Sequence, residues 1–296
     1  MTREKILISG ASGFIGKQLV PYLLKNNLDV LCISKNPEVH SNMFSINSIA
    51  LDSLLKNGGA LELDNFKPDI FLHLGWAGLP PYDTEVLESN IDISSSLFKS
   101  AIEAGVGKIL GVGSCYEYGD SCGSLEENTE KLMPNTKFGA CKIEIHKNLI
   151  NVALKNKIDQ GWIRIFYGYG PGQREASFIT KIIKAARNGE MPFIDFPNKQ
   201  IDLIHVFDIV QGLKELLTSK DALGVFNLGS GLCDSLLNYA NLVYKALDLP
   251  QLEVFESVSD KSTSSWADIS RIEKMTGWYP KVKFGDAISK LVLEYW

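Results

Sequence analysis

Three glycines spaced three residues apart, Gly10, Gly13 and Gly16, stand near the start of the chain. They follow the apolar run 6–8, which predicts a buried strand, and they open the segment 14–25, whose apolar residues recur near helical spacing. A tight turn between a strand and a helix gathers backbone N–H groups at the positive helix end, where a phosphate binds. The turn therefore predicts a dinucleotide site formed by Gly10, Ser12, Gly13, Phe14, Ile15 and Gly16.

Strands and helices are expected to alternate through the first two thirds of the chain. Apolar runs predict strands at 30–33, 46–51, 69–74, 108–112 and 162–166, and amphipathic stretches predict helices at 86–104 and 136–155. Continuous apolar strands that alternate with helices are typical of a parallel sheet covered on both faces. The sequence thus predicts an α/β fold with a Rossmann-type doubly wound parallel sheet.

The pattern changes after Pro171. Helices are expected at 178–187, 208–217, 236–247 and 287–294, separated by short strands and turns. We predict a nucleotide-binding Rossmann domain over 1–170 and a smaller mixed substrate-binding region over 171–296. No low-complexity linker divides the two regions, so they are expected to share an interface, and parts of the second region are expected to return to the first.

Composition excludes several classes of partner. The net charge is −5, and no basic stripe is present, which argues against a nucleic-acid ligand. No apolar run approaches the roughly 20 residues that cross a bilayer, so no membrane partner is expected. The five cysteines show no CxxC pair or Cys/His ligand spacing, so no metal site is expected. An odd cysteine count without a signal peptide favours the cytoplasm.

Motifs along nearly the whole chain resemble the extended short-chain dehydrogenase/reductase superfamily, which includes nucleotide-sugar epimerases, dehydratases and reductases. Besides the glycine turn, these motifs are His73-Leu74-Gly75-Trp76-Ala77, Asn90, the S-x-x-x-Y-G segment 114–119, the R-x-F-N-x-Y-G-P-G segment 164–172, and the signatures at 204–208, 226–229 and 277–280. The resemblance implies a nicotinamide dinucleotide bound partly by Leu74, Gly75, Trp76 and Asn90, and a nucleotide-sugar substrate. It also implies a homodimer formed through helices 86–104 and 136–155.

The end of the second strand bears on the choice of dinucleotide. An acidic residue there would bind the ribose hydroxyls of NAD, but this chain has Ser34 and Lys35. A hydroxyl and a cation suit a 2′-phosphate, so NADP(H) is favoured over NAD(H). Asp52 resembles the adenine-contacting aspartate of the family, and it is equally suited to a helix N-cap.

The resemblance also implies a catalytic Ser/Thr, Tyr and Lys. Ser114 and Lys142 match the first and the last, but Phe138 stands where the family has its tyrosine. Phenylalanine has no proton to give, and three explanations remain open. The chain is an engineered Tyr-to-Phe variant, a natural enzyme with another donor, for which Tyr116 is the nearest candidate, or an inactive homologue.

The residues after Ser114 bear on the reaction. Dehydratases of the family place an Asp-Glu pair there, whereas this chain has Cys115 and Tyr116, so dehydration is not expected. The sequence favours NADPH-dependent reduction of a nucleotide-linked 4-keto-6-deoxy sugar at C4, with Ser114 binding the ketone. A nucleotide-sugar 4-epimerase and a non-catalytic NADP-binding regulator are the alternatives.

Substrate contacts are expected from the segment after the last predicted strand of the sheet. Tyr167 replaces the sugar-binding asparagine of the family, and Arg174 is a candidate diphosphate ligand. Ile201 replaces a frequent phosphate-binding arginine, so another cation, such as Arg271, is needed. His205 is interpreted as a structural histidine.

Overall fold

The computed structural model describes residues 3–38, 43, 47–57, 60–78, 80, 83–129, 132–253 and 264–294. These residues form two compact units. The first comprises residues 1–119, 130–164 and 213–226, and the second comprises 120–129, 165–212 and 227–296, in each case as far as the residues are described. The predicted boundary near residue 170 stays a prediction.

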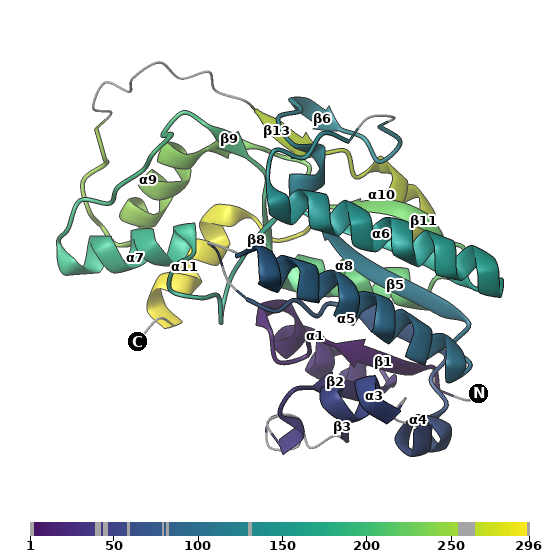
Figure 1. Ribbon diagram of the computed structural model, residues 1–296. Coiled ribbons are helices and arrows are strands. Elements are labelled where there is room, and N and C mark those ends of the chain that lie inside the picture. Colours follow the sequence, from purple (N-terminus) through teal and green to yellow (C-terminus); the bar gives the residue numbers. More distant parts are fainter. Residues whose placement is uncertain are drawn as a thin grey trace. The chain divides into compact units, whose positions relative to one another are not determined.

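A seven-stranded sheet forms the centre of the first unit, in the order β11-β7-β5-β4-β1-β2-β3 (Figure 1). Its strands are β1 (Lys5–Ser9), β2 (Asp29–Ser34), β3 (Ser48–Ala50), β4 (Ile70–His73), β5 (Lys108–Ser114), β7 (Asp159–Ile165) and β11 (Gly224–Leu228). β1 pairs in parallel with both β2 and β4. The strand order reverses between β1 and β4, and ligands of doubly wound sheets bind at such a switch point. The predicted Rossmann-type fold is confirmed.

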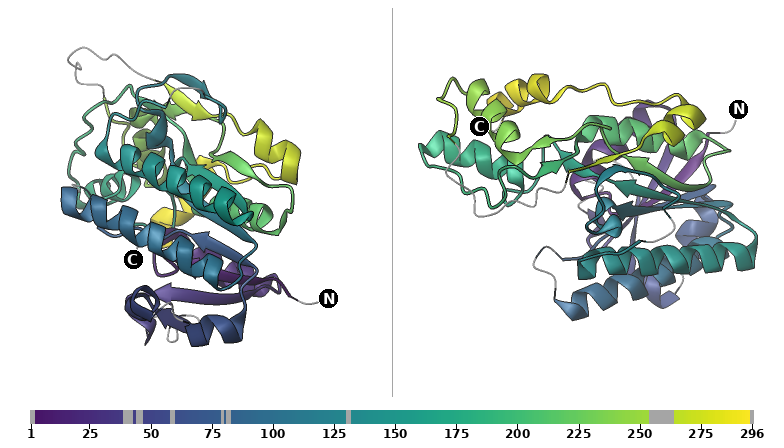
Figure 2. Two further views of the ribbon diagram at one scale, coloured as in Figure 1. Left: turned by 45° about the vertical axis from the view of Figure 1, so that its right-hand side comes forward. Right: turned by 90° about the horizontal axis from the view of Figure 1, so that it is seen from above.

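Helices cover both faces of this sheet. They are α1 (Phe14–Lys25), α3 (Leu51–Asn57), α4 (Ala60–Phe66), α5 (Thr84–Glu103) and α6 (Lys137–Asn156), with the 3-10 helix η1 (Cys115–Tyr118) after β5. α5 and α6 lie side by side on one face, and α1 lies on the other (Figure 2). The caps explain two of the starts: Asp83 accepts the N–H of Val86 at α5, and Thr136 accepts the N–H of Gly139 at α6.

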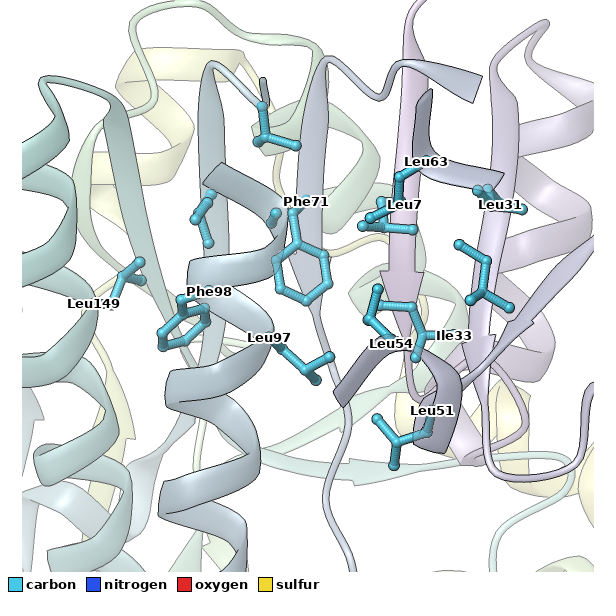
Figure 3. Close-up of a cluster of buried hydrophobic side chains, with 14 of the residues drawn as sticks. Leu7, Leu31, Ile33, Leu51, Leu54, Leu63, Phe71, Leu97, Phe98 and Leu149 are labelled. Atoms are coloured by element: carbon cyan, nitrogen blue, oxygen red, sulfur yellow. The ribbon is translucent and has the colours of Figure 1, made fainter. Parts of the chain in front are cut away.

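The core beneath α5 and α6 is built from strands and helices together (Figure 3). Leu7 of β1, Phe71 of β4 and Phe98 of α5 are almost completely buried, and the Phe71 and Phe98 rings meet edge to face. Leu51 and Leu54 of α3 close the same cluster at the β3 side. Such burial, at roughly 25 cal/mol per Å² of apolar surface, holds the helices on the sheet.

The second unit is built from short strands and helices. The strands are β6 (Gly123–Leu125), β8 (Tyr167–Tyr169), β9 (Gln200–Ile201), β10 (Leu203–His205), β12 (Asp234–Ser235) and β13 (Ser265–Ala267); the helices are α7 (Phe178–Asn188), α9 (Leu236–Ala246), α10 (Ser270–Thr276) and α11 (Phe284–Glu294). Helix α8 (Val206–Thr218) begins in this unit and ends in the first. The core lies among α7, α9 and α11.

Most predicted elements agree with the structure, including the helix 14–25. The expected strand 46–51 is shorter: β3 spans Ser48–Ala50, α3 begins at Leu51, and Ile46 lies outside the described residues. Helices α3, α4 and α10 were not expected, because each is only seven residues long. Within the described part of the chain, no helix is long and apolar enough to cross a membrane.

Candidate active site

The glycine turn connects β1 to α1 at the switch point of the sheet. Gly10 has a φ of +80°, and a Cβ there would lie 2.7 Å from the backbone N of Gly75. A Cβ on Gly16 would lie 2.4 Å from the carbonyl oxygen of Gly10. The turn is closed by a 3.0 Å hydrogen bond from the N–H of Gly13 to that oxygen. Only glycine therefore allows the helix to begin this close to the strand, and the resulting cradle fits a pyrophosphate.

A cavity of about 290 Å³ extends along the carboxyl ends of β1, β2 and β4. It collects many of the residues expected to bind the dinucleotide: Gly10, Ser12, Ser34, Lys35, Gly75, Trp76 and Asn90. Among the residues that the structure describes, no acidic side chain lines it, and no acidic residue occupies the first turn of α1. A site of this composition favours an anionic ligand.

The β2 side of the cavity is formed by polar residues. Ser34 is nearly buried, and its Oγ accepts the N–H of Asn36 at 3.0 Å, while Lys35 is exposed. Asp52 is the second residue of α3 and is exposed, so it lies just inside the helix rather than at its N-cap. Leu51 lines the cavity, but Asp52 does not.

A buried histidine, His73, lines the cavity and connects the elements around it. His73 Nδ1 lies 2.7 Å from the Ser9 hydroxyl, and His73 Nε2 lies 2.8 Å from the Ser94 hydroxyl. Ser9 also accepts the N–H of Gly75. Burial, with a smaller effect of the Lys142 charge, lowers the pKa of His73 to about 3. The ring is therefore neutral near pH 7 and acts as a structural bridge between β1, β4 and α5.

Asn90 fixes the loop that follows β4. Its Oδ1 accepts the N–H of Ala77 at 2.7 Å, and its Nδ2 donates to the carbonyl oxygens of Ala77 and Val86. The amide is 4% exposed and is used by these protein contacts. Asn90 thus shapes the cavity by holding residues 75–77 in place.

Lys142 lies on α6 with its ammonium group buried. Its Nζ donates to the carbonyl oxygen of Val112 at 2.9 Å and lies 4.4 Å from the ring centre of Trp76 and 5.8 Å from that of Phe138. The two rings meet edge to face, with their centres 4.9 Å apart. Burial lowers the pKa of Lys142 to about 8, although the negative charge of Glu117 acts in the opposite direction. Cation–π contacts with the rings stabilise the charged form.

Ser114 ends β5 and caps η1. Its Oγ accepts the N–H of Tyr116, and its own N–H donates to Glu117 Oε1 at 2.9 Å, which completes a capping box. Tyr116 is 39% exposed, and its ring meets Phe138 edge to face at 5.8 Å. Cys115 is buried. The structure thus brings the segment after Ser114 next to the Phe138 and Lys142 end of α6.

Glu117 is the only carboxylate among residues 114–119, and it is completely buried. Its Oε2 accepts the Nε of Arg164 at 2.8 Å, and both carboxylate oxygens accept the indole N–H of Trp162. Arg164 also donates to the Tyr118 hydroxyl. Glu117 does not line the cavity, and both of its carboxylate oxygens accept from these protein donors.

His146 stacks on Trp162 at the edge of this cluster. The two rings are 4.7 Å apart and nearly parallel, and the Nε2 of His146 has no hydrogen-bond partner among the described residues. Burial, followed by the charge of Arg164, lowers the pKa of His146 to about 4. Like His73, it is neutral in the folded protein near pH 7.

We expect these two histidines to make the protein less stable as the pH falls. Each binds a proton at about pH 6.5 when unfolded but only near pH 3–4 when folded, so stability is lost as the pH decreases from about 6.5 towards 4. His146→Phe retains the stacking and should reduce the slope of unfolding free energy by up to about 1.4 kcal/mol per pH unit. Urea unfolding at pH 5–7 measures this slope. The exposed neighbour Lys147→Gln should leave it unchanged, and an equal slope in His146→Phe would contradict the expectation.

The substrate residues expected from the sequence lie in the second unit. Tyr167 begins β8 and is half-buried, with its N–H bonded to the carbonyl oxygen of Asp202. Arg174 is exposed in the loop before α7. Ile201 is buried in β9. Burial raises the pKa of Glu127, and the charge of Arg271 of α10 acts in the opposite direction. The diphosphate roles of Arg174 and Arg271 stay predictions.

Two buried aspartates and one histidine organise the second unit. Asp202 accepts the backbone N–H groups of Ser230, Gly231 and Ala267. Asp208 accepts those of Lys281 and Val282. His205 Nδ1 accepts the N–H of Phe207, which supports the structural interpretation of this histidine. The two aspartates tie distant segments together, whereas the His205 contact is local.

Sequence reasoning missed the role of Glu117 and Arg164. One signal was present: Gly111 and Gly113 alternate in β5 and so face the same side of the sheet. A Cβ on Gly111 would lie 2.5 Å from the Trp162 ring, and one on Gly113 would lie 2.1 Å from Glu117 Oε1. Two glycines on one face of a buried strand indicate that large groups pack there.

Comparison with known proteins agrees with this geometry. The model of the NAD dependent epimerase/dehydratase family matches residues 6–229. The dTDP-6-deoxy-L-talose 4-dehydrogenase (NAD(+)) of Aggregatibacter actinomycetemcomitans is 25% identical over 268 residues, covering 88% of this chain and 98% of that protein. The dTDP-4-dehydro-6-deoxyglucose reductase of Escherichia coli is 24% identical over 310 residues, covering 98% and 97%.

Solved structures show the same fold. The UDP-glucuronic acid 4-epimerase from Bacillus cereus, in complex with UDP-glucuronic acid and NAD, superposes with a TM-score of 0.83 at 21% identity and covers 99% of this chain and 100% of that one. The family model covers most of the chain, including the glycine turn at the switch point described above. The chain therefore belongs to the NAD-dependent epimerase/dehydratase family, as its sequence motifs predict.

Proposed function

We propose that this protein reduces a nucleotide-linked 4-keto-6-deoxy sugar at C4, with NADPH as the hydride source. The observation that carries the proposal is the complete burial of Glu117, the carboxylate nearest to Ser114 in sequence. Because Glu117 is buried against Arg164 and Trp162, the segment after Ser114 offers no carboxylate for removing a carbon-bound proton. Elimination of water needs such a base, whereas redox at one carbon does not.

The relatives support the same choice of carbon. Two of them are named as a 4-dehydrogenase and a 4-keto-6-deoxyglucose reductase, and both act on dTDP-linked sugars according to their names. A 4-epimerase is the second candidate, because several structural neighbours are 4-epimerases. The two reactions differ in outcome: a reductase consumes NADPH, and an epimerase leaves the dinucleotide unchanged overall.

In the proposed mechanism, the residues of the chain bind the ketone and supply its proton. The bound nicotinamide supplies the hydride. Lys142 would hold the nicotinamide ribose, and the Ser114 hydroxyl would donate a hydrogen bond to the ketone oxygen. As C4 receives the hydride, the ketone oxygen takes a proton and becomes a hydroxyl.

Tyr116 is the proton donor that we assign to this chain. Phe138 has no acidic proton, and the Tyr116 ring packs against it at 5.8 Å. Tyr116 lies two residues after Ser114 and is partly exposed, so water can return a proton to its phenolate after each turnover. In this assignment, Ser114 acts together with Tyr116, whereas the family motif implies that it acts with a tyrosine at the position of Phe138.

The preference for NADPH rests on the β2 end of the cavity, where Ser34 and Lys35 lie and where the described lining residues include no acidic side chain. Lys35→Gln should raise the KM for NADPH about tenfold, because one charge-assisted phosphate contact is worth about 1.5–3 kcal/mol. The KM for NADH should not change. Lys25→Gln, at the exposed end of α1, is the control for a general effect of charge. Steady-state kinetics with both dinucleotides measures the ratio, and an unchanged KM for NADPH would rule out this contact.

The function is tested with a panel of nucleotide-linked 4-keto-6-deoxy sugars. We expect NADPH oxidation with at least one of them, slow in the chain as it stands and faster in Phe138→Tyr, with a C4 alcohol as the product. Inversion at C4 of a non-keto nucleotide sugar without NADPH oxidation would identify an epimerase. Tight NADPH binding without turnover by Phe138→Tyr on the whole panel would overturn the proposal and favour a regulator.

A further inference from the structure

A chain of buried polar groups connects the end of β1 to α5 beside the dinucleotide cavity. Ser9 Oγ lies 3.2 Å from the backbone N of Gly75 and 2.7 Å from His73 Nδ1. His73 Nε2 lies 2.8 Å from the Ser94 hydroxyl, which in turn lies 2.6 Å from the carbonyl oxygen of Asn90. Ser9, His73, Asn90 and Ser94 are each only 3% or 4% exposed. Water therefore does not compete for these contacts.

The chain has only one possible direction of donation. The carbonyl oxygen of Asn90 can only accept, so the single hydroxyl proton of Ser94 is used in that bond. The contact between His73 and Ser94 must then be an Nε2–H that donates. The buried ring is neutral near pH 7 and carries one ring proton, so its Nδ1 accepts the hydroxyl proton of Ser9. Ser9 Oγ is left to accept the N–H of Gly75.

Both ends of the chain lie on the same loop. One end is the N–H of Gly75, and the other is Asn90, whose side chain accepts the N–H of Ala77 at 2.7 Å and donates to its carbonyl oxygen at 3.0 Å. Residues 75 and 77 are thus held from both sides, and Trp76 between them lies with its ring centre 4.4 Å from Lys142 Nζ. Residues 75–77 form one wall of the cavity.

Gly75 is packed between this chain and the glycine turn. A Cβ on Gly10 would lie 2.7 Å from the backbone N of Gly75. A Cβ on Gly75 would lie 3.1 Å from Ser9 Oγ and 3.5 Å from His73 Cε1. The bond from Gly75 to Ser9 therefore keeps the loop in contact with the turn whose N–H groups form the phosphate cradle.

We infer that His73, protonated on Nε2, is a positioning residue for the dinucleotide. It orients the Ser9 hydroxyl, which holds residues 75–77 against the glycine turn and so maintains the shape of the cavity. The proton arrangement and the hold on Gly75 are properties of the protein without dinucleotide or substrate. Only the consequence for turnover rests on the proposed function.

The ring proton can be located without any ligand. Nitrogen NMR of the labelled imidazoles at pH 7 distinguishes the two neutral forms of a histidine ring. We expect His73 to carry its proton on Nε2, because Ser94 needs a donor and Ser9 needs an acceptor. A proton on Nδ1 would reverse the chain and overturn the inference.

Amide hydrogen exchange tests the hold on the loop. His73→Phe retains a ring against Phe98 but removes both ring nitrogens, so the Ser9 hydroxyl is no longer oriented. The Gly75 N–H should then exchange at least about tenfold faster. The Leu74 N–H, bonded to the backbone carbonyl oxygen of Ser9 at 3.1 Å, should keep its rate. A general loss of stability would speed both amides equally, and that result would contradict a specific hold on Gly75.

Dinucleotide affinity provides the second measurement. Calorimetric titration should show binding of NADPH and NADH about tenfold weaker in His73→Phe, the effect of one buried hydrogen bond. His146→Phe is the matched control, since it makes the same change at a buried histidine outside the chain, and it should bind both dinucleotides as before. Unchanged affinity in a folded His73→Phe variant overturns the inference.

A smaller substitution covers the case in which His73→Phe does not fold. Ser9→Ala removes the acceptor of the Gly75 N–H directly, and it should show the same faster exchange and weaker binding. Ser95→Ala is its control, because the Ser95 hydroxyl donates to the carbonyl oxygen of Ile91 and takes no part in the chain. Equal dinucleotide affinity in these two serine variants would likewise overturn the inference.

Kinetics separates positioning from a merely structural role. In the Phe138→Tyr background, His73→Phe should raise the KM for the dinucleotide about tenfold and leave kcat within about twofold. A merely structural role would reduce the amount of active protein, which lowers the apparent kcat and leaves KM unchanged. If exchange and affinity change as expected but no keto sugar is reduced, the proposed function fails and the inference stands.

Discussion

Phe138→Tyr is expected to raise kcat for ketone reduction by about 10²- to 10³-fold, the range of a well-placed general acid. The centre of the Phe138 ring lies 5.8 Å from the Lys142 Nζ, and the ring packs against both Trp76 and Tyr116, so a tyrosine here would place its phenol among the same residues. The ammonium would favour the phenolate and thus ease proton transfer. Stopped-flow measurement of NADPH oxidation under single-turnover conditions isolates this step.

Tyr116→Phe supplies the matched comparison. It should reduce the slow activity of the unchanged chain to background, because no phenol then remains next to Ser114. In the Phe138→Tyr background it should have little effect, since the new tyrosine carries the proton. Equal losses in both backgrounds would show that Tyr116 contributes binding or packing rather than a proton.

Gly16→Ala is expected to weaken dinucleotide binding by at least about a hundredfold. The added Cβ would lie 2.4–2.6 Å from backbone atoms of Gly10 and Ala11, and backbone cannot rotate away as a flexible side chain does. Relieving the overlap must move the first turn of α1 away from β1, at a cost of roughly 1–3 kcal/mol, and must open the phosphate cradle. Calorimetric titration with NADPH and NADH measures the loss.

Gly107→Ala is the control for this substitution. A Cβ there would meet only the carbonyl oxygen of Asp69 at 3.9 Å, an ordinary contact. Dinucleotide affinity should be unchanged in this variant. If Gly16→Ala binds as tightly as Gly107→Ala, the pyrophosphate does not lie at the glycine turn.

The buried strands and the glycine turn could be predicted because they rest on local patterns. The apolar runs 6–8 and 108–112 identify buried strands, and the spacing of Gly10, Gly13 and Gly16 identifies the turn between strand and helix. The family motifs likewise placed Ser114 and Lys142 near one another. Such signals are contained in a few consecutive residues.

The buried polar side chains that hold the site in place could not be predicted in the same way. Glu117 and Arg164 are 47 residues apart, and nothing in the sequence pairs them. His73 of β4 lies within hydrogen-bond distance of Ser9 of β1 and Ser94 of α5. Each of these contacts depends on how the strands pack, and only the tertiary structure shows which polar residues are buried together.

The order in which the chain is synthesised has a consequence for the sheet. β11 completes the sheet beside β7, although it follows β7 only after much of the second unit has been made. Until residues 224–228 leave the ribosome, β7 is a bare edge of an otherwise formed sheet. In the same way, β6 has no pairing strand until β13 has been made. The nascent chain therefore exposes an unpaired edge of β7 from residue 165 until residues 224–228 are made, and of β6 from residue 125 until residues 265–267 are made. In these periods a chaperone that covers strand edges would protect it from aggregation.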